Sequence, residues 1–411
     1  MSEGKNILCK ENICSHFQPI VCLKTGRIFA YEALVRGIQP ETNKIVLPDE
    51  LFAVANEENR SEEFDILCQQ SALEYFQKFS NTSKSLLFMN INTSLITSNK
   101  GAFVSLNSMT QKMGFSPNEI ALELIESKAK DSNDLIAFVK HYRETGYLIV
   151  IDDFGCEHSN MERLVQIKPD IIKVDRSIIS GIESDTYRQS ILKSIHALSE
   201  MTGSLCLAEG VETEEEILTC YKLGVDLFQG YGIIRPAFDL YDLEKQSYER
   251  INYLRSLIKK ETLSLLKEKR RLTGDINSLA DWLIRQISSC SISEMESILQ
   301  EFMILNSEME CIYLLDNKGI QISNPILPPF MKKKKRSYIF APTEIGTDNS
   351  FKSYFTCFEV FKIDRYLTDP YLSSASGNLC RTFAVKLDRD NDFIILCIDF
   401  IEEIIKTPIT Y

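Results

Sequence analysis

The chain has 411 residues, 44% of them hydrophobic, and its formal net charge is −12 from 46 basic and 58 acidic side chains. At roughly 150 residues per domain, this length predicts two or three domains, and it excludes a disordered tail or a single small module. The acidic balance argues against a nucleic-acid groove. The first 20 residues contain no apolar signal-peptide core, and the apolar run 393–398 is too short to cross a bilayer. We therefore expect a cytoplasmic protein that binds no nucleic acid and inserts into no membrane.

The cysteine and histidine patterns support neither a disulfide framework nor a zinc site. The 12 cysteines are scattered without a CxxC pair, and the 4 histidines lack ligand spacings such as HExxH. Most cysteines are expected to be buried thiols, and any metal is expected to be held by oxygen ligands.

Residues 17–236 alternate short apolar, β-branched runs with longer amphipathic segments. Helices are predicted over 61–79, 134–145, 190–202 and 213–223, with N-caps at Asp134 and Thr213. Strands that alternate with helices indicate a mostly parallel sheet, and eight strands can close a barrel. Too few residues around Gly26 join the first two runs for a crossover helix, so the barrel is predicted to open with an antiparallel hairpin. The predicted strands are 17–23, 27–35, 86–92, 119–125, 147–154, 170–175, 204–211 and 226–230.

After residue 236 the pattern changes to a long polar helix, predicted over 241–285. It is interpreted as a linker helix on a neighbouring domain rather than a coiled coil, because Glu261 and Glu268 fall on alternate core positions. Later runs predict an antiparallel sheet, hence a second domain of α+β class. These runs are 311–323, 336–341, 353–363, 380–388 and 392–401. The predicted division is 1–240, 241–300 and 301–411.

Acidic and amide side chains recur where the predicted strands end. One such acid is usually a helix N-cap or a solvated loop residue. Acids at the ends of many successive strands need another explanation, because the carboxyl ends of the strands in a parallel barrel open onto one face. Carboxylates that converge there repel one another unless divalent cations neutralise them, and oxygen ligands favour Mg²⁺, Mn²⁺ or Ca²⁺. The series is Glu32, Asn90, Glu123, Glu126, Asp152, Asp153, Asp175, Glu209, Glu212 and Gln229.

These segments together resemble the EAL-domain phosphodiesterases of bacterial cyclic di-GMP signalling. Residues 32–34 read Glu-Ala-Leu, a tripeptide that by itself occurs by chance in ordinary helices. The resemblance is specific because it continues in order from residue 17 to residue 236. It includes MNIN (89–92), ELIES (123–127), DDFG (152–155), IKVD (172–175), AEGVE (208–212), QGY (229–231) and the pair Arg235-Pro236.

The resemblance implies a (βα)8 TIM-like barrel with an antiparallel first strand and a site for two divalent cations, Mg²⁺ or Mn²⁺, with Ca²⁺ inhibitory. Lys173 is implied to hold or deprotonate the attacking water, and Glu126 to support a loop. Glu209, Glu212 and Gln229 are implied as further catalytic residues. The implied metal ligands are Glu32, Asn90, Glu123, Asp152, Asp153 and Glu209, with Asp152 shared by both ions.

Four residues are implied to contact the substrate: Gln18, Leu34, Arg36 and Asp175. The planar guanidinium of Arg36 suits a phosphate group, because it can bond two phosphate oxygens at once. The alternative for Arg36 is a surface salt bridge.

The loop after the aspartate pair departs from the family pattern Asp-Phe-Gly-x-Gly-x-Ser-Ser. Glu157 replaces the second glycine and Asn160 replaces the last serine. Where the backbone requires a positive φ, a glutamate is strained, so altered metal affinity, dimer contacts or turnover are expected. The same segment, the long helix and a C-terminal PAS-like domain resemble the YkuI-type subgroup of the family.

The C-terminal segment resembles a PAS or Cache-type sensory or dimerisation domain. Such domains bind small molecules or pair with a second copy, so a homodimer and a possible small-molecule ligand are expected. The basic run 332–336 is interpreted as a solvated loop without an assigned function.

Three hypotheses for function come from these residues and the resemblance. The leading one is an enzyme that hydrolyses cyclic di-GMP to linear pGpG with divalent cations, because every implied carboxylate ligand is present. The alternative is a receptor that binds cyclic di-GMP but hydrolyses it weakly because of the altered loop. A scaffold that pairs through the long helix is weaker, because it leaves the convergent acids unexplained.

Overall fold

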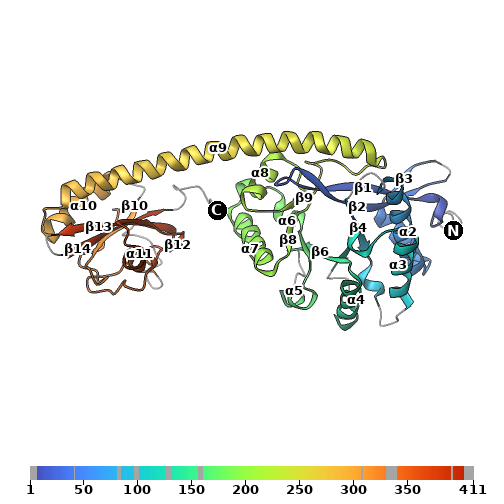
Figure 1. The fold of residues 1–411 in the computed structure, drawn as a ribbon, viewed down its shortest axis with the longest axis horizontal. Helices are drawn as coiled ribbons and strands as arrows, with labels where there is room; N and C mark the ends of the chain where they lie inside the picture. The colour runs from blue at the N-terminus through green and yellow to red at the C-terminus, as the bar shows by residue number, and fades with distance from the viewer. Residues whose placement is uncertain are drawn as a thin grey trace. The chain divides into compact units, whose positions relative to one another are not determined.

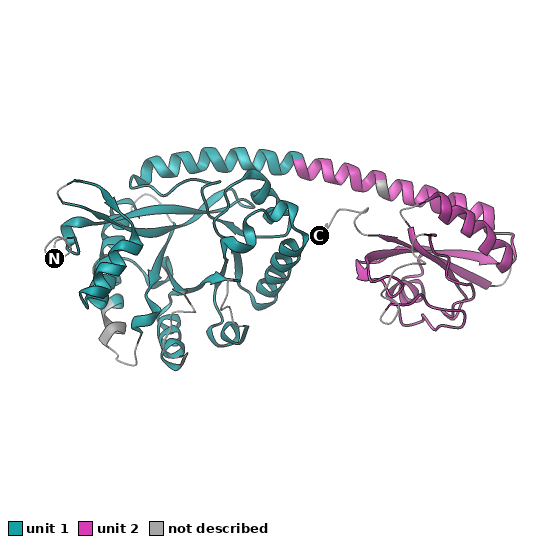
Figure 2. Ribbon diagram, turned by 180° about the vertical axis from the view of Figure 1, so that it is seen from behind, with its two compact units in different colours: residues 1–260 teal, residues 261–411 magenta. Residues whose placement is uncertain are grey.

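A computed structural model gives the fold, and it describes residues 7–40, 42–80, 85–96, 101–125, 132–155, 161–306, 309–329, 340–389 and 392–401. The chain divides into two compact units, residues 1–260 and 261–411 (Figure 2). Among the described residues, no helix combines the length and the apolar character that a membrane span requires.

The first unit is built on a closed barrel of eight strands (Figure 1). β1 pairs antiparallel with both β2 and β9, and the remaining neighbours along the barrel pair parallel. The predicted hairpin opening and the predicted parallel strands are therefore confirmed. The strands are β1 (Ile13–Cys22), β2 (Arg27–Ile38), β4 (Leu86–Ile91), β5 (Ile120–Ile125), β6 (Leu148–Phe154), β7 (Ile171–Val174), β8 (Leu205–Ala208) and β9 (Leu227–Phe228), with the short β3 (Ile45–Val46) beside β2.

Helices connect the strands and cover the outside of the barrel. Thr213 caps α8 through its side chain, as predicted. The prediction that Asp134 is an N-cap is wrong, because its helix begins at Ser132 and Asp134 lies in the first turn. The helix predicted from 190 begins at Thr186, where the side chain of Asp185 accepts two backbone hydrogen bonds. The helices are α1 (Pro48–Glu57), α2 (Ser61–Ser80), α3 (Gly101–Lys112), α4 (Ser132–Thr145), α5 (Met161–Ile167), α6 (Arg176–Ile179), α7 (Thr186–Thr202) and α8 (Glu214–Lys222).

One apolar layer fills the interior of the barrel, and every strand contributes one buried residue to it. These residues are Ile20, Ala30, Phe88, Ala121, Val150, Ile171, Leu207 and Leu227. Side chains two positions apart on a strand point to the same face. The residues two positions further toward the open end therefore also face inward, and they form the next layer.

The second unit is an antiparallel sheet with helices on both faces. α9 (Leu240–Ile287) begins in the first unit and ends in the second, where its last turns and α10 (Ile292–Leu305) pack on one face of the sheet. α11 (Ser353–Phe361) packs on the other face. The sheet order is β10-β14-β13-β11, with β12 beside β13. The strands are β10 (Met309–Leu315), β11 (Arg365–Leu367), β12 (Tyr371–Leu372), β13 (Leu379–Arg389) and β14 (Asp392–Ile401).

One predicted strand of this unit is wrong. Residues 353–361 form α11, whose buried Tyr354, Phe355 and Phe358 follow helical spacing. Its aromatic composition favours a strand, but packing of one face against the sheet decides the outcome. Most of the predicted run 336–341 lies outside the described residues.

Candidate active site

A layer of polar residues lies directly above the apolar layer of the barrel. Each polar residue lies two positions from the residue that its strand contributes to the apolar layer, on the side where the carboxyl ends of the parallel strands open. The eight positions are Gln18, Glu32, Asn90, Glu123, Asp152, Lys173, Glu209 and Gln229. The strand register thus brings together residues from widely separated segments of the sequence.

Lys173 lies at the centre of this layer and is completely buried. Its Nζ is 3.0 Å from an oxygen of Glu123 and 3.0 Å from an oxygen of Asp152. Carboxylate oxygens of Glu209 and Glu32 lie 3.3 Å and 3.7 Å from the same nitrogen. Burial opposes the charge on Lys173, but the four carboxylates outweigh it and raise its pKa well above the usual value.

Glu32 is oriented by two amide side chains. Asn90 Nδ2 donates to one of its oxygens at 2.9 Å, and Gln229 Nε2 donates to the other at 2.5 Å. Gln18 Nε2 in turn donates to the carbonyl of Ile234 at 3.1 Å. This carboxylate is therefore held in one orientation before any ligand binds.

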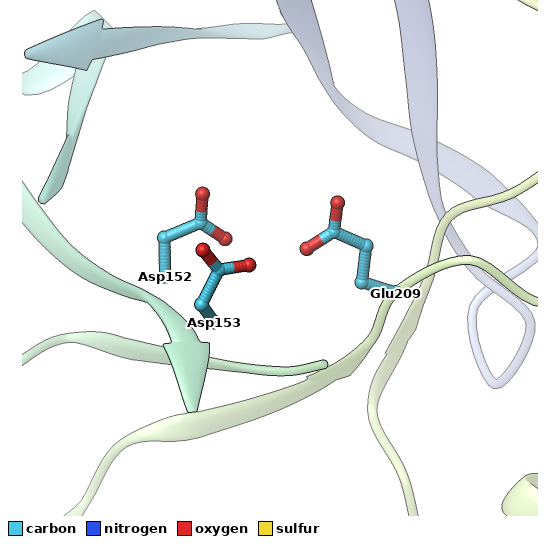
Figure 3. Close-up of side chains that lie close together, drawn as sticks. All are labelled: Asp152, Asp153 and Glu209. Atoms are coloured by element: carbon cyan, nitrogen blue, oxygen red, sulfur yellow. The ribbon is translucent and has the colours of Figure 1, made fainter. Parts of the chain in front are cut away.

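Asp152, Asp153 and Glu209 converge at one side of the layer (Figure 3). One oxygen from each of the three lies within 4.8 Å of the other two, a spacing that one cation can bridge. Asp153 has a positive φ of 55°, a conformation that is uncommon outside glycine and that is found at strained functional sites. In this conformation the side chain of Asp153 lies beside that of Asp152 (Figure 3).

The carboxylates of the layer carry more negative charge than one ammonium group balances. Both oxygens of Glu123, Oδ1 of Asp152 and Oε2 of Glu209 are buried, and these three carboxylates share the ammonium of Lys173. Burial raises the pKa of Glu209 to about 8, although Lys173 opposes the rise. Burial and the neighbouring Glu32 raise the pKa of Glu123 well above its usual value. Buried carboxylates that share one ammonium and repel one another fit a site for hard divalent cations.

The model of the EAL domain family matches residues 5–236, which is more than half of the chain. The chain belongs to the EAL domain family. It is 21% identical over 391 residues to the uncharacterised EAL-domain protein YkuI of Bacillus subtilis, covering 92% of each chain. It is 29% identical over 221 residues to the probable cyclic di-GMP phosphodiesterase PdeB of Escherichia coli, covering 54% of this chain and 42% of PdeB, so it spans less than half the length of that relative.

Solved structures of other EAL proteins share this fold. The crystal structure of Bacillus subtilis YkuI in complex with substrate c-di-GMP and calcium matches all of both chains with a TM-score of 0.75 at 22% identity. The c-di-GMP-bound form of a standalone EAL protein from Vibrio cholerae matches 55% of this chain and 92% of that one, with a TM-score of 0.50 at 32% identity. The resemblance drawn from the motifs is thus confirmed at the level of the family.

The EAL signature itself occupies β2, where Glu32 belongs to the polar layer and Leu34 lines a cavity of about 720 Å³ beside it. Glu32 and Asn90 also line this cavity. Arg36 follows on the same strand, is half-buried, and donates from its guanidinium to the carbonyl of Val35. Burial lowers the pKa of Arg36, which keeps its charge.

Two further predicted residues, like Leu34 and Arg36, lie outside the cluster around Lys173. Asp175 is the N-cap of α6 and accepts from the backbone of Ser177. Glu212 is exposed and forms an ion pair with Arg176, which lowers the pKa of its carboxyl. Glu126 and the altered loop residues Glu157 and Asn160 lie outside the described residues.

Motif spacing missed Asp65 of α2, which lines the cavity of the EAL barrel. Its carboxylate accepts from Gln69 Nε2 at 2.8 Å, and burial raises its pKa to about 7. The sequence feature that could have pointed to Asp65 is its place between Phe64 and Leu67, two apolar residues that α2 packs into a hydrophobic cluster. Only the packing of α2 brings Asp65 to the same cavity as Glu32.

Proposed function

We propose that the chain hydrolyses cyclic di-GMP to linear pGpG with divalent cations. The observation that carries the proposal is the polar layer of the barrel, with three carboxylates of Asp152, Asp153 and Glu209 within 4.8 Å of one another beside the buried Lys173. Relatives named as cyclic di-GMP phosphodiesterases, among them PdeB and PdeF of Escherichia coli, support the substrate.

The carboxylates divide into two overlapping ligand sets. Glu32, Asn90, Glu123 and Asp152 would hold one cation, and Asp152, Asp153 and Glu209 the second. Bound cations lower the pKa of a coordinated water and neutralise charge on phosphate oxygens. In the reaction, the oxygen of water bonds to one phosphorus, the bond from that phosphorus to the ribose 3′ oxygen breaks, and the 3′ oxygen takes up a proton.

Lys173 would act on the attacking water. With its four carboxylate neighbours unneutralised, Lys173 is an ammonium group that can only donate hydrogen bonds. Neutralising those carboxylates removes the cause of its raised pKa and brings it closer to the range in which it can accept the proton of the water. Gln229 would keep Glu32 oriented, and Glu212 would support the loop after β8.

Four further residues would contact the substrate. Arg36 would bind a phosphate through its planar guanidinium. Leu34 would pack against the substrate in the cavity that it lines. Gln18 and Asp175 would offer polar contacts to the substrate.

We propose Mg²⁺ or Mn²⁺ as the active cation and Ca²⁺ as an inhibitor. Solved relatives hold c-di-GMP with calcium or with manganese, as in the two complexes of Klebsiella pneumoniae BlrP1. Ca²⁺ takes more ligands at longer and more variable distances than Mg²⁺ does. Bound Ca²⁺ would therefore position the attacking water less accurately.

The deciding experiment incubates the protein with cyclic di-GMP and Mg²⁺, Mn²⁺ or Ca²⁺ and follows pGpG by chromatography. We expect pGpG with Mg²⁺ or Mn²⁺ and none with Ca²⁺. Binding of cyclic di-GMP without pGpG under all conditions would instead support the receptor alternative. Glu157→Gly with Asn160→Ser then tests that alternative, because restoring the family loop should increase turnover and leave the affinity measured in Ca²⁺ nearly unchanged.

Assembly is a separate proposal. We propose a homodimer and a C-terminal domain of PAS or Cache type that senses a small molecule or pairs two copies. Truncation after residue 236 should weaken the dimer. Light scattering that finds a monomer at micromolar concentration for the full chain would reject the dimer.

A further inference from the structure

Glu216 is a buried carboxylate outside the polar layer, on the first turn of α8, and only 6% of its surface is exposed. One of its oxygens accepts from the backbone N–H groups of Glu212 and Thr213 at 2.7 Å and 3.1 Å. The other oxygen accepts from the backbone N–H of Gly181 at 3.1 Å. Three backbone donors from two separate segments therefore converge on one side chain.

A helix cap alone does not account for these contacts. Glu294 occupies the same position of a capping box on α10, where its described hydrogen bonds go to Ser291 alone and its side chain is exposed. Glu216 makes the equivalent bond to Thr213, and it also binds Glu212 and Gly181. The additional contacts join the segment that follows β8 to the segment that follows α6.

The segment after β8 begins with Glu209 and is held along its whole length. Glu209 N donates to the carbonyl of Val174, the residue after Lys173, and Val211 N donates to the carbonyl of Gln229. The far end of the segment, at Glu212 and Thr213, is fixed by Glu216. Because its two ends and its middle are tied, the segment holds the Glu209 side chain in one place.

We propose that Glu216 is a positioning residue that keeps Glu209 within bridging distance of Asp152 and Asp153. The inference rests on the proposed function only in that it takes these three carboxylates as a cation site. Without Glu216, the backbone donors of Glu212 and Thr213 lose the acceptor that ties them to α8, the segment relaxes, and Glu209 leaves the 4.8 Å cluster part of the time.

The test measures Mn²⁺ binding to the full chain without nucleotide, by the electron paramagnetic resonance signal of free Mn²⁺. We expect Glu216→Ala to weaken binding by roughly 10-fold or more, the size typical of losing a residue that supports a metal ligand. Glu216→Gln should weaken it less, because the amide oxygen still accepts from Glu212 and Thr213, whereas its NH₂ group cannot accept from Gly181.

Three controls separate positioning from loss of a helix cap. Thr213→Ala removes the cap of α8 and Glu294→Ala removes the matching glutamate of α10, and both should lower the melting temperature but leave Mn²⁺ affinity within about twofold. Glu215→Ala changes the exposed neighbour of Glu216 and should alter neither.

Wild-type affinity in folded Glu216→Ala, or an equal loss in Thr213→Ala, would overturn the inference. If Glu216→Ala does not fold, wild-type affinity in Glu216→Gln would overturn it. Failure of the proposed function is recognised separately, as a wild-type protein that binds Mn²⁺ but forms no pGpG.

Discussion

Both units bury carboxylates on their strands, but the partners differ: an ammonium group in the barrel and uncharged hydrogen-bond donors in the second unit. In the barrel, Glu123 and Asp152 lie 3.0 Å from the ammonium of Lys173. In the second unit, Asp399 on β14 accepts from the hydroxyl of Thr382 at 2.7 Å, and Glu310 on β10 accepts from Ser376 and Asn378. No ion pair to Asp399 or Glu310 is found among the described residues, and Lys352 influences Asp399 only through its longer-range field.

Asp152 and Asp399 show how the partners of a buried acid change its pKa. Burial would raise the pKa of Asp152, but Lys173 and hydrogen bonds outweigh burial and hold it below its usual value. For Asp399, burial raises the pKa to about 7, and the neutral donors offset only part of the rise. Asp152, which stays charged beside an ammonium, can exchange that partner for a metal cation, whereas Asp399 among neutral donors takes up a proton.

The largest expected effect is the loss of turnover in Glu32→Ala. Glu32 offers two oxygens that Asn90 and Gln229 orient, and alanine cannot replace them. A metal ion contributes several kcal/mol to the transition state, so loss of this ligand should reduce kcat on the order of a thousandfold. Release of pGpG is the measurement, and Glu144→Ala, an exposed acid of α4, is the control. Full activity in folded Glu32→Ala would reject the site assignment.

The second prediction concerns Lys173, whose ammonium group is the chemical difference between the buried acids of the barrel and those of the second unit. Lys173→Met leaves buried carboxylates without a counter-charge, which should cost roughly 3 kcal/mol of the free energy of unfolding when no divalent cation is added. Mn²⁺ should restore much of this stability, because it binds the folded site alone. Urea unfolding with and without Mn²⁺ is the measurement. A variant with wild-type stability in both conditions would show that Lys173 does not balance these acids.

Much of the barrel and of its polar layer could be predicted from the sequence, because both depend on short-range patterns. Short apolar, β-branched runs located the strands, and the short link at Gly26 required the hairpin. Acids at successive strand ends then had to converge, whatever the details of packing. Their roles in catalysis stay predictions.

Other features depend on packing between distant segments and could not be predicted. Residues 353–361 are apolar and aromatic, and only the exposed sheet face that they cover makes them a helix. Asp65 lines the cavity because α2 packs beside β2 and β4. The positioning role proposed for Glu216 depends on its hydrogen bond from Gly181, which is distant in the sequence. No spacing in the sequence encodes these contacts.

The last prediction concerns Asp399 and the second unit. Because its pKa is about 7 when folded and about 3.9 in an unfolded chain, the folded unit binds more protons between these values. Stability must therefore fall as pH rises through this window. From pH 5 to pH 7 the expected loss is about 2 kcal/mol of the free energy of unfolding.

Histidines, which also titrate between pH 5 and 7, do not contribute to this change in the stability of the second unit. All four histidines lie within residues 16–196, outside the second unit. Trp282, the single tryptophan of the chain, stacks on Phe302 in that unit, so its fluorescence reports the unfolding of this unit. Asp399→Asn cannot ionise, and its unfolding should be nearly independent of pH from 5 to 7. A wild-type unit whose stability is flat or rises over this range would mean that Asp399 stays charged when buried, and the contrast with the barrel would be lost.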